Sequence, residues 1–210
     1  MIFDYLVFDL DGTLSDPKEG ITKSINYALI KHGYEAQCID VLAPLVIGPP
    51  LDESFRALTK VTDSAHIGSL VTSYRERYAD LGYRENILYD GIDEALGVLK
   101  DRGVKMGVCT SKPERFARPI LQMFDLIDYF DFVSGGDVGV KKGMQLRMLL
   151  EQKAITQNSL MIGDRAVDMI AARENNLCCA GVLWGYGSNA ELSEQNPDHL
   201  LNRVEEFKIL

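Results

Sequence analysis

Residues 5–14, which read YLVFDLDGTL, decide the fold of this chain. Four apolar or aromatic residues run directly into Asp9 and Asp11, and Gly12 then breaks the pattern. Such a run is typical of a buried strand whose end reaches the surface. Because residues i and i+2 of a strand point the same way, we expect both carboxylates to face one spot. Their mutual repulsion favours a divalent cation or a proton-transfer role at that spot.

The composition of the chain is that of an ordinary globular protein. Its 210 residues, 46% of them hydrophobic and 25% charged, suffice for one domain with an insertion or for two small domains. The formal net charge of −9 argues against a nucleic acid or an anionic membrane surface as partner. It is compatible with a small anionic substrate, because a bound cation can invert the local field.

Targeting and disulfide patterns are not recognisable in the sequence. The N-terminal residues lack the basic segment of a signal peptide, and no apolar run approaches the ~20 residues of a membrane span. The four cysteines match neither a zinc-site spacing nor a disulfide framework. We therefore expect a cytoplasmic protein.

The first part of the chain after this strand has only helical patterns. Asp16 is predicted to cap a helix that begins with Pro17. The most regular helical pattern covers residues 64–81, and a Gly-Pro-Pro loop at residues 48–50 interrupts the series. This loop is either an ordinary turn or a stiff loop that faces a ligand.

Strands return in the second part of the chain. From about residue 85 helices alternate with strands, which we expect at residues 104–109, 130–134, 159–162 and 179–183. This alternation predicts an α/β fold with a parallel, Rossmann-like sheet. Residues 1–15 and 85–210 would form the sheet domain, and residues 16–84 a helical domain inserted after the first strand.

Polar side chains follow the predicted strands where each strand ends. The set beyond the first strand includes Thr110, Ser111, Lys112, Lys141, Lys142, Asp164 and, one helical turn later, Asp168. The carboxyl ends of parallel strands meet at one edge of a sheet, where ligands of open α/β sheets bind. Carboxylates, hydroxyls and a lysine at one edge suit Mg²⁺ together with a phosphate group.

Four of these segments resemble the motifs of the haloacid dehalogenase superfamily, in its phosphatase branch. The motifs occur in the right order over nearly the whole chain: DLDGT (9–13), VCTSK (108–112), a lysine near 142, and GDRAVD (163–168). More narrowly, DPKEGITKS, IGPPL and GVLWGYGS resemble the phosphoglycolate phosphatase and 5′-nucleotidase-like subgroup. The resemblance implies a Rossmann-like core with a small helical-bundle cap, formed by residues 16–84.

The resemblance also implies roles for the acidic residues. Asp9 would be the nucleophile that accepts the phosphoryl group, and Asp11 would protonate the leaving oxygen and later activate water. Mg²⁺ would be held by the Asp9 carboxylate, the Asp11 backbone carbonyl and Asp164. Asp168 would support these ligands.

The phosphate-binding residues implied by the resemblance are Thr110, Ser111 and a lysine. Lys142, just before a predicted helix, matches the subgroup, and Lys141 is the alternative. The predicted activity is Mg²⁺-dependent hydrolysis of a small phosphorylated metabolite, such as a nucleoside monophosphate, phosphoglycolate or a sugar phosphate. The sequence does not distinguish among these substrates, or between a monomer and a homodimer.

Other functions compete with this interpretation. A non-catalytic or regulatory binding protein could keep the scaffold, although we would then expect Asp9, Asp11 or Asp164 to be lost. Cys109 and Arg115 have the Cys-x5-Arg spacing of cysteine-dependent phosphatases, but the interior of this segment has no glycine and contains a proline. Phosphonate hydrolysis would need a Schiff-base lysine in the helical insertion, for which Lys23 and Lys31 are candidates.

Overall fold

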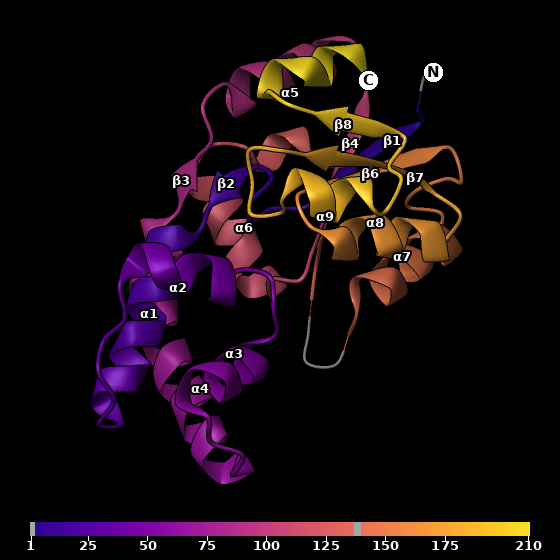
Figure 1. Cartoon of the computed structure of the whole chain (residues 1–210). Helices are drawn as coiled ribbons and strands as arrows, with labels where there is room; N and C mark the ends of the chain where they lie inside the picture. Colours follow the sequence, from indigo (N-terminus) through magenta and orange to yellow (C-terminus); the bar gives the residue numbers. More distant parts are fainter. Residues whose placement is uncertain (1–2, 137–139) are drawn as a thin grey trace. The chain divides into compact units, whose positions relative to one another are not determined.

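The computed structural model describes residues 3–136 and 140–210, which form two compact units. The sheet unit comprises Met1–Asp16 and Leu88–Leu210, and the helical unit comprises Pro17–Ile87. The chain crosses between them through β2 (Ser15–Asp16) and β3 (Ile87–Leu88), which pair in a two-stranded sheet (Figure 1). The sequence of the sheet unit is therefore divided into two segments by the helical unit.

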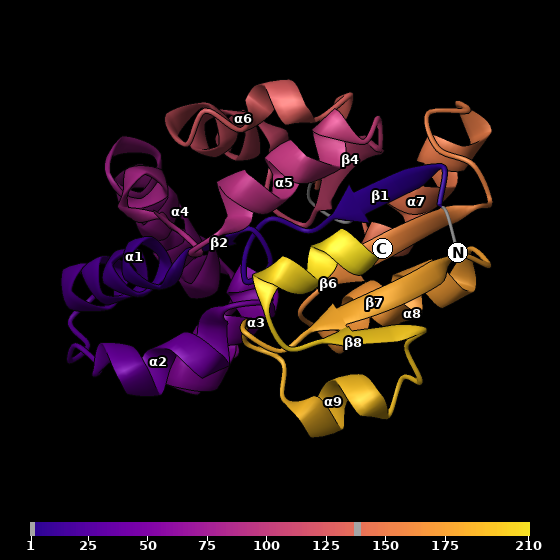
Figure 2. The same ribbon diagram turned by 90° about the horizontal axis from the view of Figure 1, so that it is seen from above.

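The sheet unit is built on six parallel strands in the order β5-β4-β1-β6-β7-β8 (Figure 2). Their bounds are β1 (Tyr5–Phe8), β4 (Lys105–Thr110), β5 (Phe132–Gly135), β6 (Ser159–Gly163), β7 (Cys178–Val182) and β8 (His199–Leu201). Phe8 lies opposite Val108 of β4 and Ile162 of β6. The residues that follow these three strands are thus brought to one edge of the sheet. The predicted fold class, an α/β parallel sheet, is confirmed.

Helices cover the sheet, as expected for parallel strands that are buried on both faces. In the sheet unit they are α5 (Ile92–Asp101), α6 (Glu114–Met123), α7 (Lys142–Glu151), α8 (Ala166–Glu174) and α9 (Asn189–Ser193), with 3-10 turns η2 (Ile127–Tyr129) and η3 (Val204–Ile209). On one face, buried Val7 and Met161 belong to the same core cluster as Leu146 of α7 and Met169 of α8.

The side chains of alternate strand residues pack on the other face of the sheet. The ring of Phe8 contacts those of Phe130 and Phe207, with centroids 6.1 and 5.3 Å apart. Trp184 packs on Phe207 from the loop after β7, with centroids 5.5 Å apart. Both faces of the central strand are therefore filled, which fixes the position of the residues at its carboxyl end.

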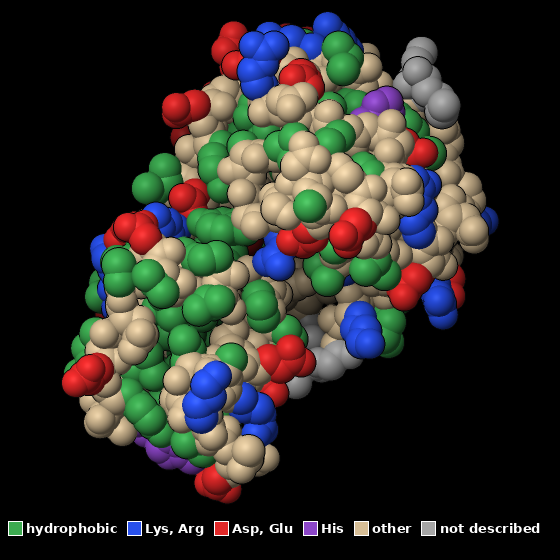
Figure 3. Space-filling view, viewed as in Figure 1, with side chains coloured by type: hydrophobic (Ala, Val, Ile, Leu, Met, Phe, Trp, Pro, Cys, Tyr) green, Lys and Arg blue, Asp and Glu red, His purple; other side chains and the backbone are tan. Residues whose placement is uncertain are grey.

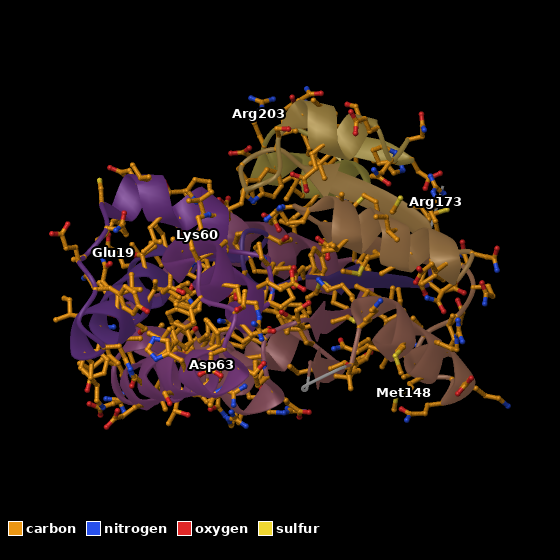
Figure 4. All side chains as sticks on the ribbon, turned by 60° about the horizontal axis from the view of Figure 1, so that its bottom comes forward. Glu19, Lys60, Asp63, Met148, Arg173 and Arg203 are labelled. Carbon is orange, nitrogen blue, oxygen red and sulfur yellow. The ribbon has the colours of Figure 1, made fainter. Side chains whose placement is uncertain are left out.

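The helical unit consists of α1 (Lys18–Lys31), α2 (Ile39–Val46), α3 (Leu51–Thr59), α4 (Ser64–Asp80) and the turn η1 (Gly82–Glu85). Figure 4 labels two residues that set its helix ends: Lys60 ends α3 in a left-handed conformation (φ 60°), and the Asp63 carboxylate caps α4. The 48–50 loop joins α2 to α3. Apolar side chains also remain on the surface of this unit, as the green patches of Figure 3 show, and Ile30, Val41 and Leu45 are each more than half exposed.

Two details of the predicted elements were wrong. The first helix has Pro17, not Asp16, as its N-cap residue: α1 begins at Lys18, and the Asp16 carboxylate accepts a hydrogen bond from the Tyr186 hydroxyl. The segment 179–183 is not the last strand, because β8 adds an edge strand of only three residues. Such a short edge strand leaves little periodic signal in the sequence.

None of the helices within residues 3–136 and 140–210 has the length and apolar character needed to cross a membrane.

Candidate active site

Asp9 lies where the central strand ends, between two neighbouring strands. Its backbone N–H donates to the carbonyl of Ile162 at the end of β6 (2.8 Å). Its carboxylate Oδ1 accepts from the N–H of Leu10 (2.8 Å), and Oδ2 pairs with the Lys142 Nζ at 2.8 Å. A buried carboxylate held by both oxygens keeps one orientation, as an in-line nucleophile requires.

Lys142 is the lysine that reaches this carboxylate. It is the first residue of α7, its side chain is 4% exposed, and its ammonium group also bonds the buried Asp168 carboxylate. Burial alone would lower the pKa of Lys142, but the Asp168 and Asp9 charges outweigh it and raise the pKa. Lys141, the alternative from the sequence, is exposed.

Asp11 has a different environment from Asp9. One carboxylate oxygen, Oδ2, pairs with the Lys112 Nζ at 2.8 Å. The other oxygen, Oδ1, is buried and has no hydrogen-bond partner within the described ranges 3–136 and 140–210. Burial raises the pKa of Asp11, an effect that the charge of Lys112 opposes. A raised pKa favours the protonated form that a general acid needs.

Asp164 follows β6 and is enclosed by backbone. Its Oδ2 accepts from the N–H of Tyr186 (2.8 Å), and its Oδ1 lies 3.5 Å from the Thr13 hydroxyl. A Cβ added to Gly12, which has φ +80°, would lie 2.1 Å from Asp164 Oδ2, and one added to Gly185 would lie 2.3 Å from Asp164 Cβ. Glycine is therefore required at both positions, because any side chain there would displace the Asp164 carboxylate.

Asp168 sits one turn into α8 and is fully buried. Its Oδ2 accepts from the backbone N–H of Arg165 (3.0 Å), and its Oδ1 takes the bond from Lys142. Burial raises its pKa to about 6, against the opposing charge of Lys142. Burial, together with the charges of Asp168 and Asp9, also raises the pKa of Asp164 well above its usual value.

Three of these carboxylates could hold a metal ion. Asp9, Asp164 and Asp168 each offer an oxygen, and these oxygens lie within 4.8 Å of one another. With Asp11 the edge carries four carboxylates, and the lysines that pair with them are Lys112 and Lys142. Four carboxylates against two lysines leave a deficit of positive charge at this edge. Oxygen ligands and this charge deficit both fit Mg²⁺.

The raised pKa values make a prediction for the metal-free protein. A carboxyl group whose folded pKa lies above its unfolded value of about 4 binds more protons when folded, so folding stability falls as pH rises between the two values. For Asp168 that window runs from about 4 to about 6. With EDTA, we expect stability to fall by up to about 2 to 3 kcal/mol across this window, and Mg²⁺ to remove much of the loss.

Thermal unfolding at a series of pH values, with EDTA and with Mg²⁺, measures this effect. Asp168→Asn is the control, and its pH dependence in EDTA should be shallower than that of the wild type. A wild-type melting temperature that rises with pH over the window in EDTA, or a slope that Asp168→Asn does not change, would contradict the prediction.

The remaining residues of the second motif differ in their burial and hydrogen bonds. Thr110 ends β4 with 1% exposure, and its Oγ1 accepts from the N–H of Lys112 (3.2 Å). Ser111 is exposed. Cys109 is buried, donates its S–H to Gln145 Oε1 at 3.2 Å, and has its pKa raised to about 12 by burial. A buried, protonated thiol is not a nucleophile, which argues against a cysteine-dependent phosphatase.

The lysines considered for a Schiff base lie in the helical unit. Lys23 pairs with Glu19 at 2.8 Å, and Lys31 pairs with Glu76 at 2.5 Å. Hydrogen bonds to these glutamates raise the pKa of Lys23 and of Lys31. A Schiff-base lysine needs the opposite shift, so neither geometry favours phosphonate hydrolysis.

Sequence reasoning gave no role to Lys112 or Tyr186, which both touch the acidic cluster. Lys112 lies within the VCTSK segment, but only the fold reveals its ion pair with Asp11. Tyr186 contacts Asp164 through its backbone N–H and Asp16 through its hydroxyl. The sequence feature that could have indicated a role for Tyr186 is its position between two glycines in the GVLWGYGS segment.

Comparison with known proteins agrees with this geometry. A family model described as haloacid dehalogenase-like hydrolase matches residues 6–182. A 5′-nucleotidase of Pseudomonas aeruginosa is 39% identical over 198 residues, 92% of this chain and 89% of that protein. The tyrosine-protein kinase PtkA of Mycobacterium tuberculosis is 35% identical over 186 residues, 87% of this chain and 62% of PtkA. A structure described as a predicted phosphatase from Clostridium acetobutylicum has a TM-score of 0.90 at 37% identity, and the match covers 100% of this chain and 98% of that one.

Proposed function

The chain belongs to the haloacid dehalogenase-like hydrolases, a family in which its relatives include phosphatases, and we propose that it hydrolyses phosphate monoesters with Mg²⁺ through an aspartyl-phosphate. One observation carries the proposal. Asp9, held by Lys142 and the backbone of Leu10, lies at the same sheet edge as Asp11, which keeps one buried carboxylate oxygen without a partner among the described residues. An oriented nucleophile beside an acid–base group is the arrangement that this reaction needs.

The first half-reaction forms the phosphoenzyme. A carboxylate oxygen of Asp9 attacks phosphorus in line, a P–O bond to Asp9 forms, and the P–O bond to the leaving group breaks. The proton on Asp11 passes to the leaving oxygen, so an alcohol departs. Thr110 and Lys142 would hold the non-bridging oxygens of the phosphoryl group, where negative charge persists.

The second half-reaction hydrolyses the phosphoenzyme, and Asp11 changes from general acid to general base. Asp11, now ionised, takes a proton from a water molecule as that water attacks the phosphorus of the aspartyl-phosphate. Inorganic phosphate leaves, and the Asp9 carboxylate is restored. Mg²⁺, held by the Asp9 carboxylate, the Asp11 backbone carbonyl and Asp164 with Asp168 in support, would offset the repulsion between an anionic nucleophile and an anionic ester.

The substrate is proposed only as a class. The P. aeruginosa relative is named 5′-nucleotidase, which makes nucleoside 5′-monophosphates the first esters to test. Phosphoglycolate and small sugar phosphates come next.

Hydrolysis of 4-nitrophenyl phosphate with Mg²⁺, and with EDTA, tests the activity. We expect turnover with Mg²⁺ and its loss with EDTA. Cys109→Ser should retain activity within a few-fold, since its thiol is buried and protonated. An inactive wild type would favour the non-catalytic binding protein, and loss of activity in Cys109→Ser alone would favour the cysteine mechanism. A panel of the esters named above then identifies the substrate.

A further inference from the structure

Lys112 is a charged residue of this sheet edge to which the reaction described above gives no role. It follows β4, and its side chain is 5% exposed in the ion pair with Asp11. Lysine is rarely buried to this extent unless its charge has a partner and a purpose.

The backbone of Lys112 is anchored on both sides. Its N–H donates to Thr110 Oγ1 (3.2 Å), and its carbonyl accepts from the N–H of Gly136, just beyond β5 (3.0 Å). Gly136 packs closely here, because an added Cβ would lie 2.5 Å from the Ser111 carbonyl oxygen. The backbone from which the Lys112 side chain extends is therefore held in place by two hydrogen bonds.

The partner carboxylate is held from one side only. The Lys112 Nζ lies 2.8 Å from Asp11 Oδ2, whereas Oδ1 is buried without a hydrogen-bond partner in the described part of the chain. Asp9 contrasts with this, since both of its oxygens are bonded. The ion pair thus holds Oδ2, whereas Oδ1 is left without a protein partner among the described residues.

From this asymmetry we propose that Lys112 is a positioning residue for proton transfer. By holding Oδ2, it presents Oδ1 of Asp11 as the atom that gives its proton to the leaving oxygen as the P–O bond breaks. The proposal rests on the phosphatase function given above and adds to it a specific effect: Lys112 should matter most for esters whose leaving group needs protonation.

Two aryl esters with leaving groups of different acidity test this proposal. The acidic 4-nitrophenol departs readily as an anion, whereas phenol depends more on a proton from Asp11. We expect Lys112→Met to lower kcat/KM for phenyl phosphate by about 100-fold and for 4-nitrophenyl phosphate by less than about 10-fold. Lys112→Arg, which keeps the charge, should recover part of the phenyl phosphate activity. Lys105→Met, at the exposed start of the same strand, is the matched control and should leave both values unchanged.

The outcomes separate this inference from the function on which it rests. If the wild type hydrolyses neither ester with Mg²⁺, the phosphatase function itself is wrong. If the wild type is active but Lys112→Met lowers both kcat/KM values equally, or raises only KM, Lys112 binds phosphate or supports the fold and the positioning role is overturned. Should Lys112→Met fail to fold, the ratio of the two kcat/KM values in Lys112→Arg decides: a ratio equal to that of the wild type at lowered activity overturns the role, and a shifted ratio supports it.

Discussion

Replacing Asp9 with Asn is expected to lower kcat by at least about 10⁴-fold, the scale on which enzymes lose activity without their nucleophile. The carboxamide is nearly isosteric but cannot attack phosphorus, and it cannot form the ion pair with the Lys142 Nζ at 2.8 Å. Steady-state hydrolysis of 4-nitrophenyl phosphate measures the loss. Acid quenching of the wild type during turnover, followed by mass spectrometry of the peptide that contains Asp9, should detect the phosphorylated residue.

Asp4→Asn is the matched control for this experiment. Asp4 lies just before the same strand, is exposed, and bonds Thr156 and Asn158. We expect it to retain full activity. An Asp9→Asn protein that folds normally and keeps more than about one hundredth of wild-type activity would remove Asp9 as the nucleophile.

The second large effect is expected for Lys142→Met, in stability as well as in activity. The substitution leaves the buried Asp9 and Asp168 carboxylates without their shared cation. Removing one partner of a buried ion pair costs about 3 to 5 kcal/mol of unfolding free energy. Loss of the charged group proposed to hold the phosphoryl oxygens should also lower kcat by a factor of about 10² to 10³.

The pH dependence identifies the cause of the instability. The raised pKa of Lys142 means that its stabilising contribution is present throughout the pH range below its usual value and is lost only at higher pH. Asp168, by contrast, takes up its proton near pH 6 in the folded protein. The destabilisation by Lys142→Met should therefore be smaller at pH 5 than at pH 7.5, because a neutral Asp168 needs no cation.

Two further variants complete this test. Lys142→Met combined with Asp168→Asn should recover part of the stability but not the activity. Lys141→Met should change either property little, since that side chain is exposed. A larger activity loss in Lys141→Met than in Lys142→Met would reverse the choice between the two lysines.

The architecture of the sheet unit could be predicted because its signals are local. An apolar run that ends on Asp9, and glycine or polar residues after each later strand, mark strand ends without reference to the rest of the chain. Parallel strands then bring these ends together whatever the details of packing. Residues 110, 142, 164 and 168 were predicted as site residues in this way, and the family comparison agrees with the predicted fold.

What could not be predicted depends on partners far away in the sequence. The Asp16 carboxylate bonds Tyr186, 170 residues later, which the local helix-start pattern of Asp16 does not indicate. The ion pair of Lys112 with Asp11 likewise joins two motifs across the sheet. The raised pKa values of the acidic residues follow from burial, which no residue spacing expresses.

The pairing of β2 with β3 bears on how such a protein can evolve. Because the chain leaves the sheet unit and returns to it through adjacent strands, the intervening segment is attached at one place and interrupts no strand of the six-stranded sheet. Insertions with neighbouring ends are tolerated well by a host domain. A segment attached in this way can lengthen, diverge or be exchanged without breaking a strand of the six-stranded sheet.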